Sequence, residues 1–192
     1  MLIGVDVDGV LADLIGAIQQ WADVYDPANG FKYAEANSWS FLKQRWPGDK
    51  TLRGFRSIID EVWEDWSTYM QPMEQCLPAS LKRLYKSPRK HKIAIFTTEP
   101  RRNHRSMLAW LEHHKIPYDE VIMSGMSGTK LEYPVDVMID DNPVLVEDAL
   151  NYPRKTVLLR DQPWNRDVGE LPPNVVRVGS LLEAVNVILG QE

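Results

Sequence analysis

The sequence predicts an α/β fold, a doubly wound parallel sheet with a small helical cap inserted after the first strand. Short apolar, β-branched runs alternate with segments of helical apolar spacing, and strands that alternate with helices form a parallel sheet with helices on both faces. Roughly 80 residues separate the first strand from the second, far more than an ordinary crossover connection contains. Because this gap has helical and aromatic patterns of its own, we interpret it as an inserted cap.

The length and composition fit one core domain with an insert. The chain has 192 residues, 44% of them hydrophobic and 26% charged, which is ordinary for a globular protein. We expect a core domain at residues 1–14 and 78–192 and a cap domain at 15–77. The net charge of −5 argues against binding to long nucleic acid, although it leaves a small phosphorylated substrate open.

The sequence also favours a cytoplasmic protein without a membrane segment. Cys76 is the only cysteine, so an intrachain disulfide is impossible and a reducing compartment is favoured. The first strand starts at Leu2 with no signal-peptide pattern before it, and no apolar run approaches the ~20 residues that span a bilayer. The oligomeric state stays open, a homodimer included.

The first strand and the cap elements follow from apolar spacing. The strand is predicted at residues 2–7, where an apolar run ends at carboxylates and a glycine. Apolar positions then follow helical spacing over 11–25, until proline and glycine break the pattern at 27–30. Residues 31–50 are irregular and aromatic, and 55–66 are predicted to form a second amphipathic helix.

The core elements alternate through the rest of the chain. The further strands are predicted at 93–97, 121–123, 135–140, 156–159 and 175–178. Helices are predicted around 81–84, 107–111, 144–150 and 181–189. Ser180 with Glu183 predicts a capping box in front of the last helix, and Gly190 predicts its end.

Polar side chains stand at the predicted carboxyl ends of the strands, where open α/β sheets bind their ligands. Strand ends and one neighbouring loop supply Asp6, Asp8, Thr97, Thr98, Lys130, Asp140 and Asp141. Crowded carboxylates need a cation, and Mg²⁺ prefers carboxylates, phosphate oxygens and waters. Hydroxyl and ammonium groups can hold the other oxygens of a phosphoryl group. The set therefore predicts phosphoryl transfer with Mg²⁺ as the cofactor.

The same residues resemble a known family. In order along the chain, DVDGV at 6–10, Thr97 after an apolar strand, Lys130, and the pair Asp140 and Asp141 resemble the four motifs of the haloacid dehalogenase-like phosphatases. The resemblance covers most of the chain outside the cap and implies a Rossmann-like core.

Within that superfamily the closest resemblance is to the 5′(3′)-deoxyribonucleotidases. It rests on DVDGVLAD directly before a helical insert, on TTEP at 97–100, and on QPWNR at 162–166. In addition, Lys130 precedes Asp140 by ten positions. The resemblance does not extend to the cap residues, and the cap selects the substrate.

The resemblance implies a role for each aspartate. Asp6 would be the nucleophile that attacks phosphorus and forms an aspartyl-phosphate. Asp8 would act as general acid and then general base, and only its backbone carbonyl would bind the metal. Asp141 would ligate Mg²⁺ directly, with Asp140 behind it and paired to Lys130, although the order of these two aspartates can be reversed.

The resemblance further implies that Thr97, Thr98 and Lys130 contact the phosphoryl group. Taken alone, these three are ordinary strand and surface residues. The acidic pairs have structural alternatives as well, which are turn or N-cap residues after the first strand and an Asx turn in Asp-Asn-Pro at 141–143.

Aromatic residues are the candidates for substrate binding. A nucleobase needs an aromatic or apolar lid, and stacking on an aromatic side chain contributes ~1–3 kcal/mol. Trp39, Phe41, Trp63 and Trp66 are candidates in the cap, and Trp164 could border the site from the core. The alternative is packing in the core, which helical spacing favours for Trp63 and Trp66 and which stays open for Trp164.

The leading hypothesis is a Mg²⁺-dependent phosphatase that hydrolyses nucleoside monophosphates, in particular 5′(3′)-deoxyribonucleotides, through an aspartyl-phosphate. The alternatives are a phosphatase of another small phosphomonoester, such as a sugar phosphate or a nucleic-acid end, and a non-catalytic nucleotide-binding module. Such a module would lack the nucleophile or the acid, and both Asp6 and Asp8 are present. A two-component receiver has its adjacent acidic pair on the first strand, which is the reverse of the order found here.

Overall fold

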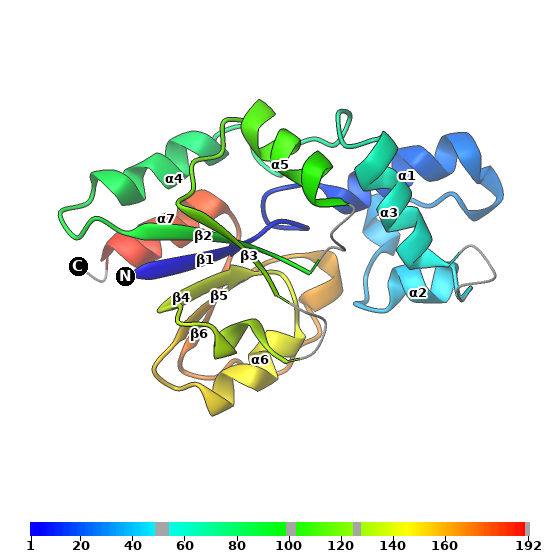
Figure 1. Cartoon of the computed structure of the whole chain (residues 1–192). Coiled ribbons are helices and arrows are strands. Elements are labelled where there is room, and N and C mark those ends of the chain that lie inside the picture. The colour runs from blue at the N-terminus through cyan, green and yellow to red at the C-terminus, as the bar shows by residue number, and fades with distance from the viewer. Residues whose placement is uncertain (49–53, 99–102, 125–127, 191–192) are drawn as a thin grey trace.

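The sheet is the centre of the molecule. The structure is a computed structural model that describes residues 1–48, 54–98, 103–124 and 128–190 (Figure 1). These residues contain one six-stranded sheet, parallel throughout, in the order β3-β2-β1-β4-β5-β6. Its strands are β1 Leu2–Asp6, β2 Lys92–Thr97, β3 Glu120–Met123, β4 Val137–Asp140, β5 Thr156–Arg160 and β6 Val175–Val178. The predicted parallel α/β sheet is confirmed.

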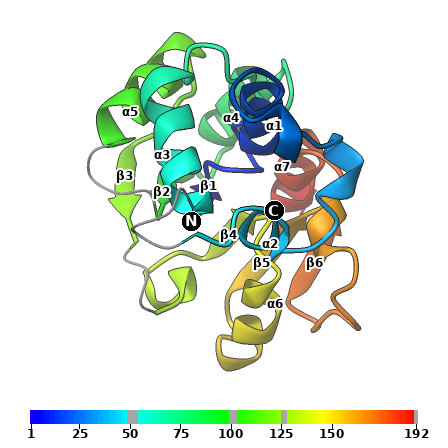
Figure 2. The ribbon, with the colours of Figure 1, turned by 90° about the vertical axis from the view of Figure 1, so that its right-hand side faces the viewer.

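Successive side chains of a strand point to opposite faces of the sheet. The buried side chains of neighbouring positions therefore belong to two apolar clusters, one on each face. Ile3, Val5 and Ile95 belong to the larger apolar cluster, whereas Ala94 and Phe96 belong to the other. Figures 1 and 2 show α6 on the opposite side of the sheet from α4 and α7. The core helices are α4 Leu77–Lys86, α5 His104–His113, α6 Val144–Asp148 and α7 Leu181–Gly190. The doubly wound arrangement is confirmed.

The insert after β1 forms a helical cap beyond the carboxyl ends of the strands (Figure 1). Its helices begin with α1, where the Asp13 side chain accepts a hydrogen bond of 2.9 Å from the Gly16 N–H. Trp21 of α1 is fully buried and packs edge-on against Trp46. The cap elements are α1 Leu14–Tyr25, η1 Pro27–Asn29, η2 Tyr33–Glu35, α2 Phe41–Arg45 and α3 Phe55–Asp65.

The two connections between cap and core run side by side. The Asp13 N–H donates to the Gln71 carbonyl over 2.9 Å, and the Met73 N–H donates to the Leu11 carbonyl over 2.8 Å. The apolar interior of the cap is nevertheless continuous with one face of the sheet. The domain division at 15–77 stays a prediction. The hydrogen-bonded crossing joins residues 11–13, just before the predicted start of the cap, to residues 71–73, a few positions before its predicted end.

The element boundaries differ from the sequence predictions in a few places. The strand expected from residue 135 starts at Val137, and the helix expected at 144–150 is α6 continued by a short 3₁₀ turn. Before α7, Ser180 Oγ accepts from the Glu183 N–H, while the Glu183 carboxylate accepts from Gly179, one residue earlier than a capping box requires. Further 3₁₀ turns are η4 Lys130–Glu132, η5 Ala149–Asn151 and η6 Pro163–Asn165. No helix in the described ranges has the length and apolarity to cross a bilayer.

Candidate active site

The candidate site lies where the strand order reverses. The sheet runs outward from β1 through β2 on one side and through β4 on the other. Asp6 ends β1 and Asp140 ends β4, so both stand at the carboxyl edge, at the topological switch point where open α/β sheets bind ligands. The cap lies over this edge (Figure 1).

Three carboxylates and one ammonium meet there. An oxygen of each of Asp6, Asp140 and Asp141 lies within 4.8 Å of the others. Lys130 Nζ is 2.7 Å from Asp6 Oδ1 and 2.7 Å from Asp140 Oδ2. All four side chains are about nine-tenths buried or more, and Asp140 is completely buried. The fold therefore brings together residues that are up to 135 positions apart in the sequence.

Burial and crowding change the acidity of this group. Burial, the largest cause, and the Asp140 carboxylate raise the pKa of the Asp6 carboxyl to about 7, while the Lys130 ammonium acts to lower it. Burial and the same neighbouring carboxylates raise the pKa of Asp141 well above its usual range. Burial alone would lower the pKa of Lys130, but Asp140 and Asp6 raise it above the ordinary lysine value. The ammonium is thus held as a cation between the acids.

These carboxylates fit a hard divalent cation. Their oxygens are close enough to share one ion, their charges repel without it, and carboxylate oxygens are the ligands that such ions bind. The two adjacent aspartates, Asp140 and Asp141, differ in their hydrogen-bond and ion-pair partners. Asp140 contacts Lys130 through Oδ2 and accepts the Asn142 N–H at 2.9 Å through Oδ1, which is an Asx-turn bond. Asp141 accepts at Oδ2 from Trp164 Nε1 at 2.9 Å, and no donor within the described ranges reaches its Oδ1.

The turn after β1 brings Asp8 and Gly9 to the same edge. The Leu11 N–H donates to the Val7 carbonyl, and Asp8 is partly exposed. Gly9 has φ +75°, a conformation that favours glycine, and a Cβ at this position would lie 2.1 Å from Asp141 Oδ2. The close approach of the two loops thus requires glycine at position 9.

The two threonines that were predicted to bind phosphate also lie at this edge. Thr97 ends β2 and is 1% exposed, with its carbonyl accepting from the Ser124 N–H. Thr98 follows it and is exposed. Glu99 and Pro100 of the TTEP segment, and residues 125–127 of the loop before Lys130, lie outside the described residues.

The candidate aromatic residues have different surroundings. Trp63 is fully buried and packs edge-on against Trp110 with 6.4 Å between ring centroids. Trp66 is half-buried between Tyr25 and Tyr69. These two have the packing of core side chains, the structural alternative considered for them. Phe41 packs against Phe31 within the cap.

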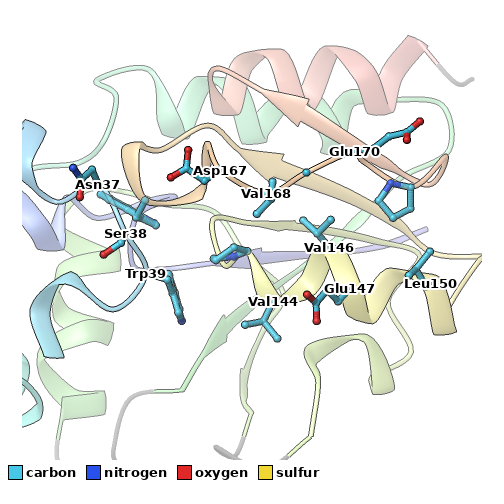
Figure 3. A pocket seen from close by; sticks show the side chains of 14 residues that line it. Asn37, Ser38, Trp39, Val144, Val146, Glu147, Leu150, Asp167, Val168 and Glu170 are labelled. Atoms are coloured by element: carbon cyan, nitrogen blue, oxygen red, sulfur yellow. The ribbon is translucent and has the colours of Figure 1, made fainter. Parts of the chain in front are cut away.

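Trp39 and Trp164 line an open groove of about 650 Å³ between the cap and α6 (Figure 3). Trp39 is 52% exposed, and Figure 3 shows its side chain near Val144, with Glu147 further along the groove. The described lining does not include the three clustered carboxylates. Because Trp164 also donates to Asp141, its indole is a wall shared by the groove and the acidic cluster.

Three residues at the site were not singled out from the sequence. Gln162 Nε2 donates to the Gly9 carbonyl at 2.6 Å, and Asn165 Nδ2 donates to the Asp141 carbonyl at 2.8 Å. Tyr33, from the cap, lies with Oη 3.5 Å from Gln162 Oε1, and burial together with Asp13 raises its pKa. The QPWNR segment marked the region of the first two, but nothing in the sequence marked Tyr33.

A family comparison identifies the chain. The model of the family described as 5′ nucleotidase, deoxy (pyrimidine), cytosolic type C protein matches residues 1–191. The chain belongs to this 5′ nucleotidase family. The resemblance to deoxyribonucleotidases is confirmed, and so is the predicted enzyme class, a hydrolase of phosphoric monoesters. Among curated proteins, no sequence match to this nucleotidase was found.

Solved structures agree with the fold. A haloacid dehalogenase-like hydrolase from Bacteroides fragilis is similar with a TM-score of 0.64 at 15% identity, over 95% of this chain and 98% of the other. A phosphonoacetaldehyde hydrolase-like protein from Oleispira antarctica gives 0.60 at 10% identity, over 99% and 94%. The D,D-heptose 1,7-bisphosphate phosphatase of B. bronchiseptica, complexed with magnesium and phosphate, gives 0.52 at 13% identity, over 100% and 99%. The nucleotidase therefore has the haloacid dehalogenase-like fold.

Proposed function

We propose that this member of the nucleotidase family is a Mg²⁺-dependent phosphatase of nucleoside monophosphates, with 5′(3′)-deoxyribonucleotides as substrates and an aspartyl-phosphate on Asp6 as intermediate. The observation that carries the proposal is the buried group of Asp6, Asp140, Asp141 and Lys130 at the carboxyl ends of β1 and β4. The family description, which names a deoxy, pyrimidine 5′ nucleotidase, supports the substrate class.

Asp6 is the proposed nucleophile. One of its oxygens forms a bond to phosphorus as the bond from phosphorus to the substrate alcohol breaks, which leaves an acyl phosphate on the enzyme. Water then attacks phosphorus, inorganic phosphate leaves, and the carboxylate is regenerated. The Lys130 ammonium at 2.7 Å favours the ionised carboxylate that this step needs.

Asp8 is the proposed general acid and base. It follows Asp6 by two positions in the turn after β1, and its partial exposure supports contact with a substrate and proton exchange with solvent. Its carboxyl gives a proton to the departing alcohol oxygen and then accepts one from the attacking water.

Asp6 and Asp141, with the backbone carbonyl of Asp8, are the proposed Mg²⁺ ligands, and Asp140 is proposed to hold Lys130 in place. The partners of the two adjacent aspartates support this assignment. Both oxygens of Asp140 already have donors, the Lys130 ammonium and the Asn142 N–H, whereas no donor within the described residues reaches Asp141 Oδ1. Mg²⁺, when bound, neutralises the crowded carboxylates and screens the phosphate from the anionic nucleophile. The magnesium and phosphate in the structure of the similar heptose bisphosphate phosphatase support the cofactor.

Lys130, Thr97 and Thr98 are proposed to bind the phosphoryl oxygens. The lysine supplies a positive charge beside the nucleophile, and the threonines end the neighbouring strand at the same edge. Donors that are already in place when charge develops stabilise a transition state without further reorganisation. A cytoplasmic location is also proposed, which the word cytosolic in the family description supports.

Steady-state assays on a panel of phosphomonoesters test the proposal. We expect Mg²⁺-dependent release of phosphate from deoxyribonucleoside monophosphates, loss of release with EDTA, and no measurable release by Asp6→Asn. The matched control is Asp136→Asn, because Asp136 accepts from the Leu2 N–H at the amino end of the sheet. Its turnover should equal that of the wild type. Fast turnover of a sugar phosphate with none of any nucleotide would refute the substrate class and favour the alternative phosphatase.

A further inference from the structure

The segment after β5 contributes no candidate catalytic residue, yet it contacts both acidic loops of the site. Gln162, Trp164 and Asn165 belong to η6 and its N-cap, and they are 3%, 8% and 1% exposed. We call these three residues the η6 clamp. A polar group that is buried to this extent is expected to be hydrogen-bonded, so its partners indicate what the segment does.

Two donors of the η6 clamp converge on Asp141. Trp164 Nε1 donates to its carboxylate at 2.9 Å, and Asn165 Nδ2 donates to its backbone carbonyl at 2.8 Å. One bond orients the side chain and the other holds the main chain. Asn165 Nδ2 also donates to the Arg160 carbonyl at 2.7 Å, which ties the loop after β4 to the end of β5.

The third member of the η6 clamp holds the turn after β1. Gln162 Nε2 donates to the Gly9 carbonyl at 2.6 Å, and Gly9 lies so close to Asp141 that a Cβ at this position would be 2.1 Å from its Oδ2. The clamp thereby fixes the distance between the turn that contains Asp8 and the loop that contains Asp141.

The η6 clamp is itself rigid. Gln162 and Asn165 form reciprocal capping bonds across η6, and Arg177 of β6 donates to the Asn165 side chain at 2.7 Å and to its carbonyl at 2.9 Å. A hydrogen-bonded support of this kind orients a ligating carboxylate before the metal arrives.

The donors distinguish the two adjacent aspartates. Asp140 has a donor on each oxygen, the Lys130 ammonium at Oδ2 and the Asn142 N–H at Oδ1, so both of its oxygens are already engaged. Trp164 gives Asp141 a neutral N–H, which orients one oxygen and leaves the negative charge and the other oxygen for a cation. Adjacent aspartates thus acquire different roles from their partners.

We propose that Trp164 and Asn165 are positioning residues that make Asp141 the metal ligand, that Gln162 positions the opposing turn, and that the η6 clamp therefore sets the affinity for the metal. This inference rests on the proposed function, because it takes the acidic cluster to be a metal site. It assigns to Trp164 a role through Asp141 in place of stacking on a nucleobase.

Mn²⁺ binding, measured from the free-ion signal in electron paramagnetic resonance, tests the inference without any assay of activity. Trp164→Phe keeps a ring and loses the N–H, and we expect its Kd for Mn²⁺ to rise about tenfold, as removal of such a supporting bond commonly does. Saturating Mg²⁺ should restore most of kcat, since the nucleophile and the acid are intact.

Trp110→Phe is the matched control. Trp110 is equally buried, and its Nε1 donates to the Met70 carbonyl at 2.8 Å, away from the acidic cluster. It loses the same indole N–H and the same volume, so it should lower the melting temperature with a Kd for Mn²⁺ within twofold of the wild type. If Trp164→Phe does not yield folded protein, Gln162→Met is measured in its place, and its Kd should also rise.

Three results are distinguishable. A raised Kd in the η6 clamp variants alone supports the inference. Wild-type affinity in Trp164→Phe, or an equal loss in Trp110→Phe, overturns the clamp while the proposed function stands. A wild-type protein that binds neither Mn²⁺ nor Mg²⁺ overturns the metal site, and the clamp inference with it.

Discussion

The carboxyl edge of the sheet and the cap that covers it are stabilised by different physical interactions. At the edge, Asp6, Asp140 and Lys130 are buried charges that meet at 2.7 Å. In the cap, Trp21 and Trp63 are fully buried rings that meet their neighbours through edge-on contacts. Charged contacts have a required direction and partner, whereas packed rings require only volume and shape. From this difference we expect that the activity proposed above depends on a few contacts at the edge and that substitutions in the cap affect it less.

The largest effect is expected from Lys130→Met, which tests the edge. The variant leaves Asp6 and Asp140 as two buried carboxylates without their cation, so we expect a loss of about 3–5 kcal/mol in the free energy of unfolding. We also expect turnover to fall by a factor on the order of 10³, since the cation proposed to bind the phosphoryl group is lost. Urea unfolding and phosphate-release assays measure both. Lys92→Met, at an exposed position on β2, is the control and should change neither.

Trp63→Ala tests the cap by the same two measurements. Removing a fully buried indole should cost about 3–5 kcal/mol of stability, from the lost burial and the cavity that remains. The kcat and KM of the folded fraction should stay within about twofold of the wild type. A tenfold rise in KM at unchanged stability would contradict the packing role and return Trp63 to the substrate candidates.

A smaller effect is expected where the two regions touch. Tyr33→Phe removes the cap hydroxyl that donates to Gln162 Oε1 at 3.5 Å and lies near Asp13, and a lost hydrogen bond typically costs about 1 kcal/mol. We expect a modest rise in the KM for a nucleotide, measured by steady-state kinetics. Tyr85→Phe loses a comparable bond of 3.0 Å to Asp119 and is the control, in which KM should not change. Equal KM values in the two variants would contradict a contact between Tyr33 and the working site.

The smallest effect is expected from Trp39→Ala. This side chain is 52% exposed in a groove whose described lining lacks the clustered carboxylates. Its loss should change the free energy of unfolding by no more than about 0.5 kcal/mol, as surface substitutions usually do. Kinetics with a nucleotide should be unchanged, and a severalfold rise in KM would instead extend the substrate site into the groove.

The sequence predicted the edge better than the cap for a physical reason. Each apolar run in the sequence shows where a strand ends, and the carboxyl ends of parallel strands lie at one edge of the sheet. Asp6, Thr97 and Asp140 could therefore be assigned to one edge before any contact was known. Helical spacing in the cap predicts a stripe of buried residues but not the element that the stripe contacts. Trp63 and Trp39 were therefore both candidates for substrate binding, with core packing favoured for Trp63, and the structure has Trp63 buried and Trp39 exposed.

The hydrogen bonds that support the site could not be predicted, although the QPWNR segment marked the region that supplies them. The bonds from Trp164 and Asn165 to Asp141 exist because β5 lies beside β4, which is a long-range fact. The sequence also left open which of Asp140 and Asp141 would be the metal ligand, because the two are distinguished by their hydrogen-bond donors. Local pattern likewise misplaced the capping partner of Glu183, which accepts from Gly179.

The paired crossing between Leu11–Asp13 and Gln71–Met73 has an evolutionary consequence. The chain leaves the sheet and returns to it at adjacent, hydrogen-bonded positions. The intervening sixty or so residues are therefore joined to the core by two neighbouring chain connections, besides packing contacts such as that of Trp63 with Trp110. Insertions, deletions or exchange of that module need not disturb the register of any strand. Substrate specificity can thus change through replacement of the cap, while the acidic cluster at the sheet edge stays the same.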